Sequence, residues 1–176
     1  MGMAGPALVK AGTGEEISKE DLGGAKRQAD QQGIADLAVE TEEECYAAIR
    51  NFLSYLPQNA TQPPPIRSCD DPAERRDEIL LDLVPADSRK VYDVRKVIEV
   101  IADRDSVFEI KPKYARNIVT CFARLAGRPV GFVANQPLRK GGILDSPASE
   151  KVAHFIAVCD AFGLPLVSLI DIPGFA

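Results

Sequence analysis

The sequence predicts an α/β fold, and three observations in its second half support this. Apolar residues recur at helical spacing over 94–101 and again over 152–162. Runs rich in β-branched and aromatic residues occupy 117–125, 130–135 and 165–172. The order strand, strand, glycine loop, helix, strand contains a crossover connection, which places the last strand parallel to the one before it.

Residues 1–40 are rich in glycine, and we expect an irregular, packed segment there. Gly23 and Gly24 favour a tight turn or a close approach of two backbone segments. A phosphate-binding loop is the alternative interpretation. The pair lacks the GxxxxGK[ST] pattern, and no predicted strand precedes it.

The next segment predicts a helix over 41–56. Thr41 and Glu44 have the spacing of a capping box, and Pro57 ends the helix. One face carries the apolar residues Cys45, Ala48, Ile49, Phe52 and Leu56. Residues 57–90 follow as a linker, because three consecutive prolines at 63–65 favour an extended path.

The regular part of the chain begins at 91. Asp93 is placed to cap a helix with Val94, Val97, Ile98 and Ile101 on one face. A short strand is expected at 106–110. The runs 117–125 and 130–135 are expected to form a hairpin around the sequence AGRP.

Ser146 is expected to cap the last helix, with Pro147 at its first position, and Gly163 to end it. Its inward face is predicted to carry Val152, Phe155, Ile156, Cys159 and Phe162. The strand at 165–172 is almost continuously apolar, as in a sheet that is covered on both faces.

Composition excludes several classes of protein. The net charge of −5 and the absence of Trp argue against a nucleic-acid-binding platform. No apolar run approaches the roughly 20 residues of a membrane span, and the N-terminus lacks the pattern of a secretory signal. These features indicate a cytoplasmic protein, or one of the mitochondrial matrix if the source is eukaryotic.

The sequence also offers no pattern for a metal site or for a Ser-His-Asp catalytic triad. The cysteines at 45, 69, 121 and 159 form no CxxC pair, so we expect free and mostly buried thiols. His154 is the only histidine, and it falls between apolar helix positions, where it is expected at the boundary of the core. We therefore predict no metal site and no catalytic side chain.

Ligands of open α/β sheets bind at the carboxyl ends of the strands. Two such ends carry marked sequences here, VANQP followed by GGILD, and LIDIPGF. These pieces, together with EK at 150–151 and CDAFGLPLV at 159–167, resemble the C-terminal carboxyltransferase domain of biotin-dependent acyl-CoA carboxylases. The segment GPALVKAGTGEEISKEDLGGA resembles the end of the N-terminal domain of the same family. Propionyl-CoA and methylmalonyl-CoA carboxyltransferase β subunits are the most similar branch.

The resemblance implies a crotonase-like ββα spiral fold, of which this chain is part. Residues 1–56 would end the N-domain, 57–90 would link the domains, and 91–176 would form the first half of the C-domain. The implied reaction moves a carboxyl group from carboxybiotin to the α-carbon of a short acyl-CoA such as propionyl-CoA. Biotin would be carried by a partner, the biotin carboxylase or biotin carrier subunit, and the complete enzyme would be a homo-oligomer, hexameric in this family.

The reaction needs paired backbone N–H donors where negative charge develops on oxygen. The two glycine turns that supply them in the family have no counterpart in this sequence, so we expect an internal fragment that is inactive alone. Gln28 stands where many members of the family carry His.

The resemblance assigns the substrate and biotin side of the site to Asn135, Gln136, Gly141, Gly142, Gly174 and Phe175. For each position a structural alternative remains: a turn that joins strand to helix, or a side chain that braces a loop. Asp171 would orient the backbone near the turn or pair with a buried base.

Three other hypotheses compete with a carboxyltransferase fragment. The chain could be a non-catalytic oligomerisation or interaction module, because half a domain leaves an unpaired sheet edge and an exposed apolar face. It could be part of a longer chain that holds the complete enzyme. A doubly wound, flavodoxin-like binding domain is the weakest alternative, because no phosphate loop supports it.

Overall fold

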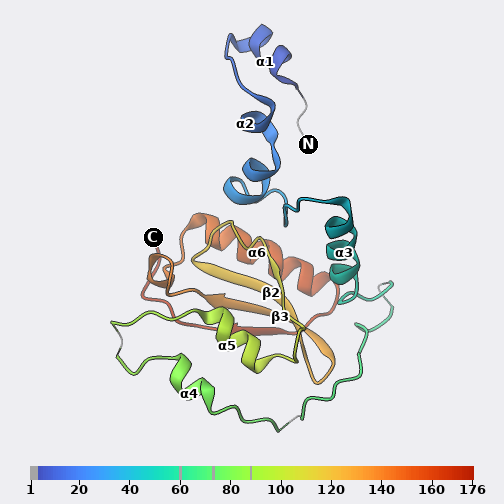
Figure 1. Ribbon diagram of the computed structural model, residues 1–176, viewed down its shortest axis with the longest axis vertical. Coiled ribbons are helices and arrows are strands. Elements are labelled where there is room, and N and C mark those ends of the chain that lie inside the picture. The colour runs from blue at the N-terminus through green and yellow to red at the C-terminus, as the bar shows by residue number, and fades with distance from the viewer. Residues whose placement is uncertain (1–3, 60, 73, 88) are drawn as a thin grey trace.

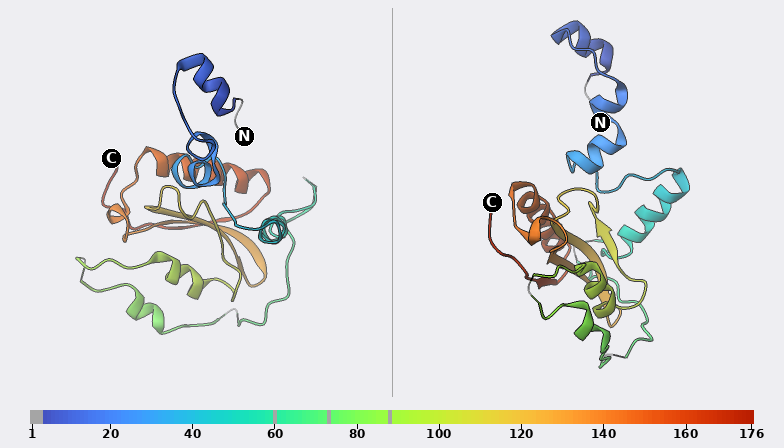
Figure 2. Two further views of the ribbon diagram at one scale, coloured as in Figure 1. Left: turned by 45° about the horizontal axis from the view of Figure 1, so that its top comes forward. Right: turned by 60° about the vertical axis from the view of Figure 1, so that its left-hand side comes forward.

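The computed structural model describes residues 4–59, 61–72, 74–87 and 89–176. Helices cover both faces of a mixed sheet, and the N-terminal helices project away from it (Figures 1 and 2). The helices are α1 Pro6–Thr13, α2 Lys19–Gly23, a π-helical turn η1 Arg27–Gln31, α3 Glu42–Leu53, α4 Ile79–Leu83, α5 Val94–Ile101, a 3-10 turn η2 Lys140–Gly142 and α6 Ser146–Ala161. The strands are β1 Phe108–Ile110, β2 Ile118–Leu125, β3 Arg128–Asn135 and β4 Leu166–Leu169.

The predicted sheet topology is confirmed. Within the described residues, four strands lie in the order β1-β2-β3-β4. The first three are antiparallel, and β2 and β3 form the expected hairpin, which turns at Ala126 and Gly127. The α6 crossover brings β4 parallel to β3, with Gly131 opposite Leu166 and Ala134 opposite Leu169.

Side chains along β2 and β3 point alternately to the two faces of the sheet, and each face has its own hydrophobic core. Val119, Cys121 and Ala123 face α5 together with Phe132, and Asp93 caps that helix through the N–H of Arg95, as predicted. On the other face, Phe122 contacts the rings of Phe52, Tyr55 and Phe155. The second core therefore joins the end of α3 to α6 and the sheet.

The first 40 residues correct one prediction, because they contain α1, α2 and η1 rather than an irregular segment. Ser18 caps α2 by accepting the N–H of Asp21, and Pro6 stands in the first turn of α1. The glycines mark helix ends: Gly14 follows α1 and Gly24 follows α2. The glycines therefore separate short helices in this segment, and their number does not exclude helices.

Helix α3 begins as predicted, with the Thr41 hydroxyl accepting the N–H of Glu44. It ends at Leu53, before the predicted Leu56, and the Ser54 hydroxyl there donates to the Asn51 carbonyl oxygen. Phe52 and Leu56 pack inward, whereas Ile49 stays about half exposed. The expected linker at 57–90 contains the short helix α4, and the two domain boundaries remain predictions.

Helix α6 starts with a different cap from the one predicted. The Asp145 carboxylate, one residue before Ser146, accepts the N–H of Ala148. A carboxylate next to the free amides of a first turn also gains from the helix dipole. Gly163 terminates the helix with a positive φ, as expected.

The buried face of α6 is rotated from the predicted one. Phe155 and Cys159 are buried as predicted, but Ile156 and Phe162 are partly exposed. Their places are taken by Ala148 and Lys151, which are both buried. His154 is exposed.

Strand β4 is shorter and more open than predicted. It covers Leu166–Leu169 and alternates between exposed and half-buried residues, because it forms an edge of the described sheet. The predicted burial on both faces is therefore wrong for this strand. The short strand expected at 106–110 is also trimmed, to Phe108–Ile110.

Candidate functional site

Two loops leave the carboxyl ends of the parallel strands β3 and β4 and run beside each other. The first covers 136–145 and contains η2, and the second covers 170–176. The N–H of Leu144 donates to the Gly174 carbonyl oxygen at 3.2 Å, and the N–H of Ala176 donates to the Leu144 carbonyl oxygen at 3.1 Å. This parallel bridge between Leu144 and Phe175 joins the loops that contain all the predicted site residues after Asn135.

Gly142 allows these loops to approach closely. Gly141 and Gly142 both have positive φ, at 63° and 78°. A Cβ at Gly142 would lie 2.7 Å from the carbonyl oxygen of Asp171, whereas a Cβ at Gly141 would meet nothing within 4 Å. Gly142 is thus required by packing between the loops, and Gly141 only by backbone conformation.

Asn135 connects the two loops through its amide. Its Nδ2 donates to the Gly142 carbonyl oxygen at 2.9 Å, and its Oδ1 accepts the N–H of Asp171 at 3.3 Å. The side chain is almost fully buried. The geometry therefore gives Asn135 a bracing role between β3 and both loops.

Gln136 braces a different neighbour, the start of α5. Its Nε2 donates to Asp93 Oδ1 at 2.6 Å, and its Oε1 accepts the N–H of Val94 at 3.3 Å. Gln136 has no exposed surface. It anchors the loop to the helix that covers the sheet from below in Figure 1.

Gly174 and Phe175 lie at the open side of the paired loops. A Cβ at Gly174 would meet no heavy atom within 4 Å, and the Phe175 side chain is 79% exposed. Among the described residues, no hydrogen bond engages the amide N–H of either one. The turn thus presents two N–H donors next to an apolar ring.

Two residues outside the predicted set, Asn117 and Tyr92, stabilise these loops. Asn117 Nδ2 donates to the Ile143 carbonyl oxygen at 2.7 Å and to Asp145 Oδ1 at 3.1 Å. The Tyr92 hydroxyl donates to Asp171 Oδ2 at 2.9 Å, which fits the expectation that Asp171 has a structural role. Desolvation, and then the bond to Asp171, raises the pKa of Tyr92 to about 12.

Asp145 has the opposite shift. Its hydrogen bond from Lys140, followed by that from Asn117, lowers the pKa of the carboxyl below its ordinary value. The Lys140 Nζ to Asp145 Oδ2 distance is 2.5 Å. Asp145 therefore serves the loop and the cap of α6 as a carboxylate.

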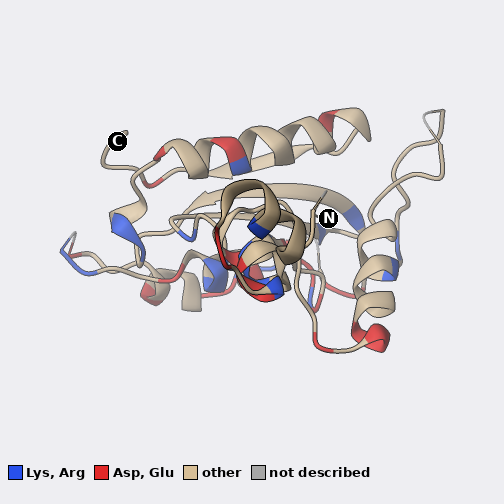
Figure 3. Cartoon of the chain, turned by 90° about the horizontal axis from the view of Figure 1, so that it is seen from above, with Lys and Arg blue, Asp and Glu red and all other residues tan. Residues whose placement is uncertain are grey.

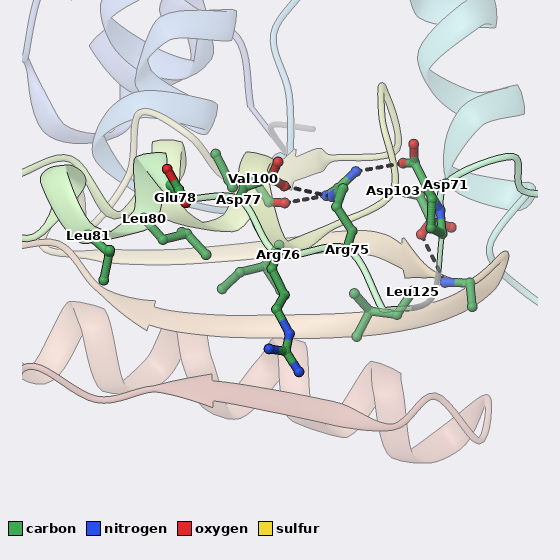
Figure 4. A pocket seen from close by; sticks show the side chains of 13 residues that line it. Asp71, Arg75, Arg76, Asp77, Glu78, Leu80, Leu81, Val100, Asp103 and Leu125 are labelled. Atoms are coloured by element: carbon green, nitrogen blue, oxygen red, sulfur yellow. Dashed lines mark hydrogen bonds and ion pairs between the residues drawn. The ribbon is translucent and has the colours of Figure 1, made fainter.

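A hollow of about 660 Å³ lies elsewhere, between residues 71–72 and 75–81, α5 and the β2–β3 turn (Figure 4). Arg75 crosses it, paired with Asp71 at 2.9 Å and with Asp77 at 2.7 Å. It shares no lining residue with the paired loops. The loops, not this hollow, contain the predicted site.

Cys69, Asp71 and Asp103 offer ligand atoms within 4.8 Å of one another. However, Asp71 is paired with Arg75 and Arg104, and Asp103 accepts the N–H groups of Ala126 and Gly127. These partners account for the carboxylates without an ion. The described cysteines are all free thiols, two of them buried.

Basic and acidic residues are interspersed over the chain in the view of Figure 3. In the described part of the chain, no helix has both the length and the hydropathy that a membrane crossing needs.

Comparison with known proteins identifies relatives over the whole chain. The family model "Carboxyl transferase domain" matches residues 1–176. Methylmalonyl-CoA decarboxylase subunit alpha of Veillonella parvula is 45% identical over 175 residues, with 99% of this chain and 34% of the relative covered. The mitochondrial propionyl-CoA carboxylase beta chain of Homo sapiens is 42% identical, with 98% of this chain and 32% of the relative covered.

Solved structures agree with this result. The hexameric transcarboxylase 12S with bound methylmalonyl-CoA matches with a TM-score of 0.95 and 41% identity, over all of this chain and 34% of that one. A single-chain, multi-domain long-chain acyl-CoA carboxylase matches with a TM-score of 0.81 and 33% identity, over all of this chain and 17% of that one. The chain spans about a third of the length of the curated relatives it matches. Its crotonase-like α/β fold and its sequence place it in the carboxyl transferase domain family of the biotin-dependent acyl-CoA carboxylases.

Proposed function

We propose that this chain builds the biotin side of an acyl-CoA carboxyltransferase site, in which a carboxyl group moves from carboxybiotin to the α-carbon of a short acyl-CoA such as propionyl-CoA. One observation supports this most directly. The two loops at the carboxyl ends of β3 and β4 are joined at Leu144 and Phe175, and they present two amides without a partner among the described residues, beside an exposed ring.

The residues present fit the biotin ring system. The N–H groups of Gly174 and Phe175 are donors for a ureido oxygen, and the Phe175 ring offers apolar surface to the remainder of the bicycle. Bound carboxybiotin supplies the carboxyl group. The chain's own residues bind and orient: Gly142 sets the loop spacing, while Asn135 holds both loops in register.

The proposed function is tested with the polypeptide that the gene encodes and with residues 1–176 alone. The complete polypeptide is expected to decarboxylate methylmalonyl-CoA in the presence of free biotin. Residues 1–176 are expected to show no turnover, because the family's two glycine turns have no counterpart in them and the Gly174 and Phe175 amides offer donors on the biotin side alone. Turnover by 1–176 would show that the site is assigned to the wrong part of the protein.

Substitution of Phe175 locates the site within the polypeptide. Phe175→Ala is expected to raise the KM for free biotin about tenfold while leaving the KM for methylmalonyl-CoA unchanged. Phe162→Ala, at a partly exposed ring after α6, is the matched control. Equal effects of the two variants would exclude Phe175 from the biotin site.

An oligomeric assembly with a biotin carboxylase or biotin carrier partner is part of the same proposal. Tyr46, Ile49 and Leu53 form an exposed apolar stripe on α3, and the related transcarboxylase 12S is a hexamer. Light scattering of the complete polypeptide is expected to show an oligomer. A well-folded monomer would exclude this part of the proposal, and would also exclude a purely structural oligomerisation module.

A further inference from the structure

Lys151 is a buried cation that binds only backbone. It lies on α6 with 2% of its surface exposed. Its Nζ donates three hydrogen bonds, each of 2.9 Å, to the carbonyl oxygens of Lys111, Tyr114 and Ile118. Among the described residues, no carboxylate lies within ion-pair distance of it. All three N–H groups of the Lys151 ammonium therefore bind one segment, residues 111–118.

That segment has an unfavourable backbone conformation. Lys111 and Ala115 have φ of 53° and 43°, in the left-handed region that residues with a Cβ avoid. Two of the carbonyl groups that Lys151 binds belong to Lys111 and to Tyr114, which directly precedes Ala115. Strained residues persist only where their surroundings hold them, and here the ammonium group does so.

The same segment contains Asn117, which holds the first loop of the candidate site. The Asn117 side chain donates to the Ile143 carbonyl oxygen and to Asp145 Oδ1. Its backbone carbonyl accepts the N–H of Gln136 at 2.9 Å. Three bonds therefore run from this one residue to loop 136–145, on both sides of the glycine pair.

We propose that Lys151 is a positioning residue for the biotin side of the site. It fixes the 111–118 segment, the segment places Asn117, and Asn117 sets the position of the Gly141–Gly142 turn. The inference rests on the proposed function, because it assumes that this turn borders the biotin site. Lys151 touches no ligand in this scheme, and its effect passes through the main chain.

Lys151→Met tests the proposal in the polypeptide that the gene encodes, since methionine keeps an unbranched side chain, one atom shorter, and removes the donors. The KM for free biotin in methylmalonyl-CoA decarboxylation is expected to rise about tenfold, with the KM for methylmalonyl-CoA unchanged. Hydrogen exchange of the amides in 139–145 is expected to accelerate. His154→Met, at an exposed position of the same helix, is the control and is expected to change neither.

A second variant separates positioning from a general loss of stability. Asn117→Ala is expected to reproduce the rise in the KM for biotin. The double variant is expected to have nearly the same KM for biotin as either single variant, because both substitutions act through one route. Additive effects, or equal rises in both KM values, would overturn the proposal. So would unchanged exchange in 139–145 in Lys151→Met.

The failure of the proposed function would look different. If the wild-type polypeptide showed no saturation with biotin, the assignment of the site would fall. Exchange in 139–145 of Lys151→Met and Asn117→Ala would still decide whether Lys151 holds the glycine turn. If Lys151→Met did not fold, Asn117→Ala alone would be decisive. Amides in 139–145 of Asn117→Ala that exchanged as slowly as in the wild type would overturn the route through Asn117.

Discussion

The sheet and the N-terminal helices differ in how they are stabilised. Strand β2 buries seven of its eight residues, whereas α1, α2 and α3 contain no residue that is buried. Both regions have clear local signals, such as the Thr41 cap of α3 and the Asp93 cap of α5. Local signals decide where a helix forms, but only pairing between distant segments creates a core.

This difference also separates the site from its surroundings. The first of the paired loops follows β3, which buries six of its eight residues, and Asn135 at the end of that strand braces both loops. In contrast, Leu8, Ile34 and Leu53 are each more than half exposed in the N-terminal region. A substitution in the sheet core should therefore cost far more than one in α1, α2 or α3.

The largest expected effect is that of Phe122→Ala. Phe122 is fully buried and touches three aromatic rings, so its removal leaves a cavity in the second core. We expect the free energy of unfolding to fall by about 3–5 kcal/mol in urea denaturation. Leu8→Ala, in the exposed part of α1, is expected to stay within about 0.5 kcal/mol of wild type. Similar losses in both variants would contradict the contrast between the regions.

Lys151 provides a test that depends on pH. Desolvation lowers the pKa of Lys151 from 10.5 to about 8. The charged groups around it are Glu109, which raises the pKa, Arg95 and Lys111, which lower it, and the Cys121 thiol. Between about pH 8 and pH 10.5 the unfolded chain binds more protons at this lysine than the folded chain, so stability rises with pH in this window.

The comparison of wild type with Lys151→Met isolates this contribution. The difference in the free energy of unfolding between the two is expected to grow by up to ~3 kcal/mol from pH 7 to pH 10.5, because methionine does not titrate. Urea denaturation across this range measures it. A constant difference would mean that the ordinary pKa is retained in the folded chain. Groups that titrate in both proteins cancel in the comparison.

The two glycines of the first loop separate backbone strain from close packing. Alanine at either position must adopt a positive φ, which costs about 1–2 kcal/mol. Only Gly142→Ala also places a Cβ 2.7 Å from the carbonyl oxygen of Asp171. We expect Gly142→Ala to be less stable than Gly141→Ala by a further ~1–3 kcal/mol in urea denaturation. Equal losses would show that the two loops separate without cost.

Sequence patterns predicted the elements whose determinants are local. The Asp93 cap, the hairpin turn at Ala126–Gly127 and the stop at Gly163 all depend on a few adjacent residues. The crossover rule then gave the parallel pairing of β3 and β4. It also brought the NQP and DIPGF sequences to the same edge of the sheet.

The predictions that failed depend on neighbours distant in sequence. The burial of Lys151 requires three carbonyl groups from 111–118, and no pattern within α6 indicates it. The exposure of β4 reflects its place at the edge of the described sheet. The bracing roles of Asn117 and Tyr92 likewise require partners 26 and 79 residues away.

The smallest effect we predict concerns one of these distant contacts. The Tyr92 hydroxyl donates to Asp171 Oδ2, and Tyr92→Phe removes that bond without changing the ring. We expect a loss of about 1 kcal/mol in the free energy of unfolding near pH 7. Tyr46→Phe, at an exposed ring of α3, is the control and should leave stability unchanged.

The pH dependence of this variant tests the burial of the hydroxyl and its bond to Asp171 together. Because the pKa of Tyr92 is raised to about 12, its contribution is complete below pH 10 and is lost as the pH rises through 12. The difference between wild type and Tyr92→Phe should therefore shrink above pH 10. The difference in the free energy of unfolding between wild type and Lys151→Met grows from pH 8 to pH 10.5. The two variants therefore show pH dependences of opposite sign. If the Tyr92→Phe difference stayed constant above pH 10, the pKa of Tyr92 would not be raised in the folded chain, which would contradict both the burial of the hydroxyl and its bond to the Asp171 carboxylate.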